Sequence, residues 1–440
     1  MSQLASIIDD EAAGRATPEE IFRVNAARET ARARLLTLYI STGLFFMLLP
    51  GTFLGVWNLM AISSHRAADS VSPSWIQAHG HAQIFGWIGT FILGIGFYSI
   101  PKLRNLKFSV WLQVIAWGLW TSGVALRWLA NIYLWHWRIL LPLSAALEFA
   151  AFLIFFRTVS GHRPQESVKG RLDQWIFVVI AGAMGLLLAL GLNLGVSIHL
   201  ALKGISPAIG ADFDQSFLVL QAWGFLVPFV WGFSTKWLPI FLGLRPVRGR
   251  VLWLAVALNS LGVLGSFLHM PRLASLLLRV GAGAAIDALN LFRSPVRPAK
   301  VKGVHQSFPS FVRAAYAWAL VAASLGIWAA ATTEGHGIGG ASRHALTVGF
   351  LALMVFAIGQ RVLPAFAGAR PLFSTRLMFA SMFLLVVGCT IRVSAEVLAY
   401  QGFMPSAWAW LPISAVTEMG AVTAFAGNLF LTFVIEPRQV

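Results

Sequence analysis

Charged side chains are scarce in this sequence: they make up 11% of its 440 residues, whereas apolar types make up 58%. This composition predicts an integral membrane protein. Cysteine occurs once, as Cys389 inside an apolar run, which excludes a disulfide within the chain and favours a packing role for this residue. Strict alternation of apolar and polar residues is also lacking, which excludes barrel strands and predicts an all-α, polytopic membrane fold.

Long apolar runs set the number of helices. A hydrocarbon core about 30 Å thick requires about 20 apolar residues per helix, and twelve runs satisfy this. They cover residues 35–60, 78–100, 108–130, 139–157, 174–200, 216–241, 250–270, 272–292, 311–333, 343–366, 374–398 and 407–434. We therefore expect one membrane domain over residues 35–434. The polar residues 1–34 contain no cleavable signal peptide and predict a cytoplasmic segment with an interfacial helix.

The distribution of Lys and Arg gives the orientation. With twelve spans and both termini inside, the inner side holds 25 of the 33 basic residues and the outer side holds five. This asymmetry predicts a bacterial inner membrane protein with cytoplasmic termini. The net charge of +16 then reflects contact with the lipid bilayer and gives no reason to expect nucleic acid as a partner.

Three of the runs share one layout, which indicates an internal repeat. They end at Pro101, Pro239 and Pro364, and each has a glycine fifteen residues before its proline. Twenty residues before the proline the first and last runs have His81 and His344, whereas the middle run has valine. The sequence thus predicts three pseudo-symmetric units of four helices, over residues 35–157, 174–292 and 311–434.

Acidic residues extend this pattern to the fourth helix of each unit. Glu148 and Glu418 follow similar Leu-Pro-x-Ser-Ala segments, and Asp287 lies near the corresponding place in the middle unit. Charged side chains within a membrane usually face a partner or a cavity. We therefore expect these acids to point into the bundle, either in structural ion pairs or at a functional site.

The two histidines that share a repeat position predict a haem site. His81 and His344 lie at matching depth near the outer face, and two imidazoles from facing helices can occupy both axial positions of a haem iron. Arg127 and Arg392, at similar places in the third helices, are candidates to hold haem propionates, although structural ion pairs are an equal alternative. Arg392 can also pair with Glu396, four residues later on the same helix.

Other histidines at the outer side suggest a second metal. His79 projects about 200° away from His81 around its helix, and His199 and His269 end two helices of the middle unit. Imidazole ligands suit copper as well as iron. The competing interpretation is that these three are scattered interfacial residues.

The segment Gln77–Trp87, with the sequence QAHGHAQIFGW, and the segment HALTVG from His344, with Arg361 following, resemble the NnrS family. That resemblance covers most of the chain. It implies twelve spans, haem and copper, and a link to the nitric oxide response. The plan of three by four helices also resembles the catalytic subunit of haem–copper oxidases, in which helices two and ten provide the low-spin haem ligands; His81 and His344 match those positions.

The sequence departs from the oxidases at the copper ligands. Ser342 stands where the tenth helix of an oxidase has a further histidine, the sixth helix has no histidine, and the seventh has only His269. An oxidase-type dioxygen centre, or a nitric oxide reductase of that architecture, is therefore not expected. Three function classes remain: a haem protein that protects against nitric oxide, an oxidoreductase acting on nitric oxide or quinol, and a transporter that uses the buried acids and arginines.

Overall fold

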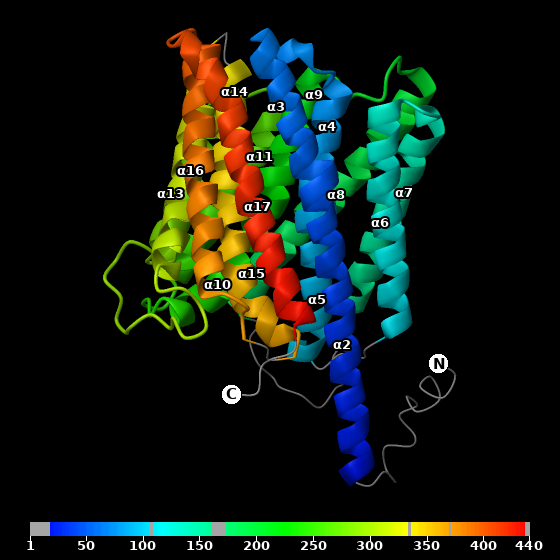
Figure 1. Ribbon diagram of the computed structural model, residues 1–440, viewed down its shortest axis with the longest axis vertical. Helices are drawn as coiled ribbons and strands as arrows, with labels where there is room; N and C mark the ends of the chain where they lie inside the picture. The colour runs from blue at the N-terminus through cyan, green and yellow to red at the C-terminus, as the bar shows by residue number, and fades with distance from the viewer. Residues whose placement is uncertain (1–17, 105–108, 161–172, 333–335, 369–370, 436–440) are drawn as a thin grey trace.

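The computed structural model describes residues 18–104, 109–160, 173–332, 336–368 and 371–435; residues 1–17 of the predicted N-terminal segment lie outside this part. The described residues are helical with short connections and contain no strand. Most helices run along the long axis of one bundle (Figure 1). The prediction of an all-α protein is confirmed.

For reference we divide the helices, in chain order, into three consecutive sets. The first set comprises α2 (Pro18–Phe46), η3 (Met47–Phe53), α3 (Leu54–His65), η4 (Ala68–Ser70), α4 (Pro73–His81), η5 (Ala82–Gly89), α5 (Thr90–Arg104), α6 (Val110–Tyr133) and α7 (Trp137–Val159). The second comprises α8 (Gln174–Lys203), α9 (Ala211–Val219), η6 (Leu220–Leu226), α10 (Val227–Phe241), α11 (Gly249–Phe267) and α12 (Pro271–Ala288). The third comprises α13 (Phe308–Ala331), α14 (His336–His344), η7 (Ala345–Ala352), α15 (Leu353–Phe366), α16 (Thr375–Tyr400), η8 (Pro405–Ala409) and α17 (Trp410–Val434).

Ten helical stretches of the described chain are long and apolar enough to cross a membrane. The other two predicted spans are helical, as α6 and α12, but fall outside this group. At 1.5 Å per residue, the 24 residues of α6 extend about 36 Å and the 18 residues of α12 about 27 Å. The chain is therefore a multi-pass membrane protein with ten candidate spans in its described part.

Several helix ends differ from the predicted limits. α2 runs unbroken from Pro18, so the described part of the predicted interfacial helix continues directly into the first span. The second helix begins at Pro73, where proline occupies the first helical turn and needs no backbone donor. His81 consequently lies inside a continuous helix, although the apolar run alone indicated a start close to it.

Three of the four π-helical segments in the described part of the chain mark equivalent places; the fourth is η3 in the first span. η5 begins immediately after His81, η6 immediately after Val219, and η7 immediately after His344. π-helical segments are rare and often accompany functional sites. The position defined by counting back from the three prolines is therefore also the position at which the local backbone geometry changes.

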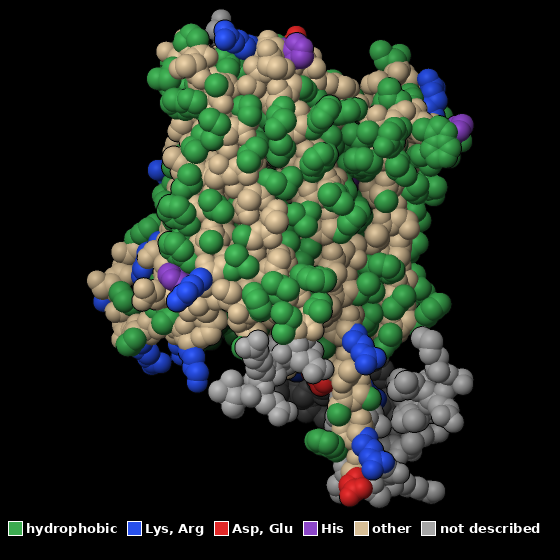
Figure 2. Space-filling model, in the orientation of Figure 1, with side chains coloured by type: hydrophobic (Ala, Val, Ile, Leu, Met, Phe, Trp, Pro, Cys, Tyr) green, Lys and Arg blue, Asp and Glu red, His purple; other side chains and the backbone are tan. Residues whose placement is uncertain are grey.

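The ends of the bundle can be named by these helices. We call the end formed by α4, α9 and α14 the histidine end, and the end at which α5, α10 and α15 finish the proline end (Figure 1). α2 extends beyond the bundle at the proline end. Figure 2 shows hydrophobic side chains over the middle of the visible face, with Lys and Arg mainly at the proline end. This distribution is that expected of a helical bundle surrounded by lipid.

Candidate functional site

A cavity of about 390 Å³ lies at the histidine end of the bundle. Its lining includes five of the seven histidines and arginines that the sequence suggested as metal or cofactor ligands: His79, His81, Arg127, His344 and Arg392. They come from four helices, α4, α6, α14 and α16, which are separated by long stretches of sequence. The cavity has the size of an ordinary small-molecule site.

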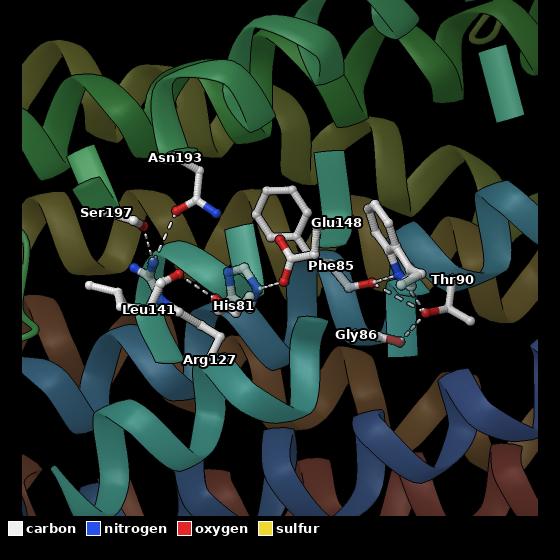
Figure 3. A network of polar contacts seen from close by, with 11 residues as sticks. His81, Phe85, Gly86, Thr90, Arg127, Leu141, Glu148, Asn193 and Ser197 are labelled. Atoms are coloured by element: carbon white, nitrogen blue, oxygen red, sulfur yellow. Dashed lines mark hydrogen bonds and ion pairs between the residues drawn. The ribbon is translucent and has the colours of Figure 1, made fainter. Parts of the chain in front are cut away.

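His81 is held by an acid from the fourth helix. Its Nε2 lies 2.7 Å from Oε1 of Glu148 on α7, and its ring stacks on Phe85 with centroids 4.6 Å apart. Both His81 and Glu148 are buried, and Oε2 of Glu148 has no partner among the described residues. Figure 3 shows the carboxyl group facing the imidazole. Nε2 of His81 is thus already engaged by Glu148.

Arg127 is oriented by two polar side chains of α8. Its Nη1 donates to Oδ1 of Asn193 at 3.0 Å and to Oγ of Ser197 at 3.2 Å (Figure 3). These are neutral acceptors, and Arg127 is almost completely buried. A buried guanidinium without a directly paired carboxylate favours an anionic ligand nearby.

His344 has a different environment from His81. Its Nδ1 lies 3.1 Å from both the backbone oxygen of Gly340 and Oε2 of Glu396, and its Nε2 lies 3.3 Å from Nη2 of Arg392. Because arginine only donates, Nε2 must accept, and the proton of the neutral ring resides on Nδ1. His344 therefore presents a lone pair at Nε2, which is the form that binds a metal.

The predicted pairing of Arg392 with Glu396 is confirmed. Nε of Arg392 lies 3.1 Å from Oε1 of Glu396, and both side chains are buried. Glu396 therefore contacts Arg392 and His344 together. It is a residue of the cavity lining that the sequence marked only as a partner of Arg392.

His79 also lines the cavity, although it was predicted to point away from the face of His81. Its Nδ1 lies 2.9 Å from the backbone oxygen of Gly51, which requires Nδ1 to donate. No partner of its Nε2 is found among the described residues. His79 thus also presents a ring nitrogen lone pair.

The third and fourth helices of the first and last sets meet through a matching glycine. A Cβ at Gly123 would lie 2.7 Å from Cγ of Glu148, and a Cβ at Gly388 would lie 2.7 Å from Cγ of Glu418. Arg127 follows Gly123 by four residues, as Arg392 follows Gly388. Each hairpin, α6–α7 and α16–α17, therefore carries an arginine and an acid in the same relative positions.

In the middle hairpin, α11–α12, a glycine also packs against the neighbouring helix, but the equivalent positions carry neither an arginine nor an acid. A Cβ at Gly262 would lie 2.8 Å from Leu278, and the residue four after Gly262 is Ser266. Leu278 is consequently the counterpart of Glu148 and Glu418. Histidine, arginine and acid are replaced together in this set by Val219, Ser266 and Leu278.

Asp287 does not point into the bundle, as was expected, but it forms ion pairs, which was the alternative that the sequence left open. Its side chain is 43% exposed and forms ion pairs with Arg248 and, at 3.0 Å, with Arg293. Counting from Pro239 placed it near the repeat position of Glu148, but helix contacts rather than chain length determine which residue faces the neighbouring helix. Asp287 stabilises the surface where α11 and α12 meet the following loop.

His199 and His269 are not brought to the cavity. Both side chains are exposed, and neither belongs to the cavity lining. In the described part of the chain, no group of three or more His, Cys, Asp or Glu side chains lies close enough together to hold a metal ion. The copper site predicted from His79, His199 and His269 therefore has no geometric support there.

Two further charged residues of the lining were not predicted. Asp214 and Arg343 both line the cavity, and Nη1 of Arg343 donates to Oε1 of Gln215 at 2.8 Å. Close by, Gln77 exchanges two hydrogen bonds of 2.9 Å with the backbone of Ile209. The signal available in the sequence was the pair Asp212 and Asp214 at the start of an apolar run, where the positive end of the helix dipole favours acids.

Several buried polar atoms along the cavity have no partner among the described residues. They are Oδ1 of Asn58, Nε1 of Trp87, Nε of Arg127, Nη1 of Arg392 and Oε1 of Glu418. Buried polar groups are normally satisfied, so unpaired ones in the lining of a cavity favour a polar or charged ligand there. Most of these atoms are donors, which favours a ligand with acceptor oxygens.

Among solved structures, a heme–copper terminal oxidase, determined as a dimer by cryo-electron microscopy, superimposes with a TM-score of 0.56 and 14% sequence identity. The alignment covers 92% of this chain and 85% of the oxidase chain. The chain has the fold of a haem–copper terminal oxidase. Because identity is so low, this similarity establishes the fold, and the site must be argued from its own residues. No protein-family model and no curated protein matches the sequence.

Proposed function

We propose that this protein is a haem-binding membrane protein of the nitric oxide response, with His81 and His344 as axial ligands. The observation that carries the proposal is the shared cavity: imidazoles from α4 and α14 and guanidinium groups from α6 and α16 line one space. The oxidase-like fold and the two histidine segments similar to the NnrS family support it further. When bound, a haem with two histidine ligands supplies low-spin electron-transfer chemistry.

The residues present fit such a group in two respects. Nε2 of His344 carries a lone pair, and Nδ1 of the same ring is oriented by Gly340 and Glu396, as in typical metal-binding histidines. Arg127 and Arg392 each have a nitrogen without a partner among the described residues, and propionate carboxylates are suitable acceptors. The donor set therefore matches a large ligand with two anionic groups.

His81 is suited to bind iron once its hydrogen bond to Glu148 is broken. Its Nε2 hydrogen-bonds to Glu148, so binding of iron through this atom would replace that hydrogen bond. His79 offers an Nε2 lone pair without such an exchange and is the competing ligand on the same helix. Variants of both residues are therefore required to assign the ligand on α4.

The proposal also includes the finer organisation predicted from the sequence. We propose twelve spans, with α6 and α12 completing the ten apolar ones, in three four-helix units over residues 35–434. The repeated glycine contacts of α6–α7, α11–α12 and α16–α17 support the units. We further propose residence in a bacterial inner membrane with both termini cytoplasmic, which the excess of basic residues at the proline end supports.

An absorption spectrum of the purified protein after haem-replete expression tests the function. We expect a Soret band with low-spin features, lost in His344→Ala and in His81→Ala and retained in the control His269→Ala. Absence of a Soret band in the wild type would contradict the proposal and favour transport. Loss in His79→Ala with retention in His81→Ala would move the ligand to His79. Sustained turnover of nitric oxide with a reductant would instead identify an oxidoreductase.

A further inference from the structure

A second cavity, of about 410 Å³, lies at the proline end of the bundle. Its walls come mainly from the three helices that end in proline, α5, α10 and α15, which lie together at that end in Figure 1. The walls are apolar side chains such as Phe91, Phe229 and Ile358. Ile88 and Leu226 line both cavities and therefore lie between the second cavity and the histidine cavity.

Two lysines interrupt this apolar lining. Lys102 stands at the end of α5, and its Nζ pairs with Oε2 of Glu29 at 2.7 Å. Lys236 lies on α10, with its Nζ 4.2 Å from the ring centre of Trp175 and 5.6 Å from that of Trp237. No described carboxylate is within ion-pair distance of Lys236; Asp173 acts on it electrostatically from farther away and accepts a hydrogen bond from Trp175. Lys236 thus contributes a half-buried, unpaired positive charge.

We propose that this cavity binds an anionic lipid, with an apolar chain between α5, α10 and α15 and a negatively charged head group at Lys236. Water would find few hydrogen-bond partners on these walls, whereas a hydrocarbon chain gains dispersion contacts with them. The aromatic rings of Trp175 and Trp237 hold the ammonium group of Lys236 beside the cavity by cation–π contacts. Basic pockets between helices at the positively charged side of a membrane protein characteristically bind anionic head groups.

The shared chemistry of the ligand is one long apolar chain joined to an anion. A free fatty acid and an acidic phospholipid both satisfy it, because the chain fills the cavity and either a carboxylate or a phosphate can contact Lys236. A neutral head group, as in phosphatidylcholine or a quinone, would leave the lysine without a counter-charge. The proposal therefore requires a negatively charged lipid head group. It does not depend on what binds in the histidine cavity.

Native mass spectrometry of the full chain in detergent tests the proposal with palmitate, phosphatidylglycerol, phosphatidylcholine and ubiquinone as separate probes. We expect palmitate or phosphatidylglycerol to remain bound to the wild type, and the mass of the adduct distinguishes the two sources. Lys236→Gln should weaken binding of the anionic probe roughly tenfold, by loss of a charge-assisted contact. Lys300→Gln, which removes an exposed lysine outside the cavity, is the matched control and should bind like the wild type.

A second variant addresses the cavity independently of charge. Val362→Phe places a larger side chain in the wall and should exclude the lipid while Lys236 is retained. Thermal unfolding of each preparation reports folding, and the Soret band reports the state of the histidine cavity. Equal binding of phosphatidylcholine or ubiquinone, or equal binding of the anionic probe by Lys236→Gln and Lys300→Gln, would overturn the proposal.

Discussion

Glu148 of α7 lies 2.7 Å from His81 of α4, whereas its counterpart in the middle of the chain is Leu278, which faces the backbone of α11 without a charged partner. The same helix contact is therefore built twice with an acid, at Glu148 and Glu418, and once with an apolar side chain, at Leu278. This difference separates the part of the fold that forms the histidine cavity from the part that only packs.

Exchanging these two side chains tests that distinction. We expect Glu148→Leu to insert and fold, because leucine occupies the equivalent contact in α12, but to alter the haem spectrum because His81 loses its partner. The reverse change, Leu278→Glu, should destabilise the protein by about 2–5 kcal/mol, since it buries an acid without a partner. Unfolding midpoints and absorption spectra of both variants provide the measurement; a stable Leu278→Glu protein would contradict the comparison.

The glycine contact at α6–α7 gives a second prediction. A Cβ at Gly123 would lie 2.8 Å from the backbone oxygen of Ser144 as well as against Glu148, so Gly123→Ala should cost about 1–3 kcal/mol through overpacking. At Gly118, earlier on α6, an added methyl group would meet no atom within 4 Å, so Gly118→Ala provides the control. Thermal unfolding in detergent should show a loss of stability for Gly123→Ala only.

Metal content tests the exposed histidines. His199 and His269 lie outside the cavity, so we expect a His199→Ala/His269→Ala double variant to retain the metal content of the wild type. Elemental analysis for iron and copper is the measurement. Selective loss of copper from the double variant would restore the copper site predicted from the sequence.

Membrane topology can be measured with reporter fusions. Fusions after Lys102 and Arg297 should report a cytoplasmic position, and a fusion after Asp212 a periplasmic one, because basic residues are retained on the inner side. The result also tests α12, since removing this helix as a span would reverse every later loop. A cytoplasmic signal from the fusion after Asp212 would contradict the twelve-span arrangement.

The sequence alone determined the class and most helices, and it indicated the positions of the proposed repeat. Apolar runs of about 20 residues can satisfy their backbone groups within a bilayer only as helices, and the spacing back from Pro101, Pro239 and Pro364 led to His81, Val219 and His344. These features follow from local chain geometry and from the cost of charge in lipid, which act on each segment independently of its neighbours. The association of Arg392 with Glu396 was predictable for the same reason, since four residues span one helical turn.

Only the tertiary structure decided which of these residues share a cavity. Helix rotation and tilt depend on packing between helices, which the spacing of residues along a single helix does not specify. For this reason His79 faces the cavity, Leu278 rather than Asp287 corresponds to Glu148, and His199 and His269 remain at the surface. The sequence specified how far along its helix each side chain lies. Contacts between helices that are distant in the sequence specified which way that side chain faces.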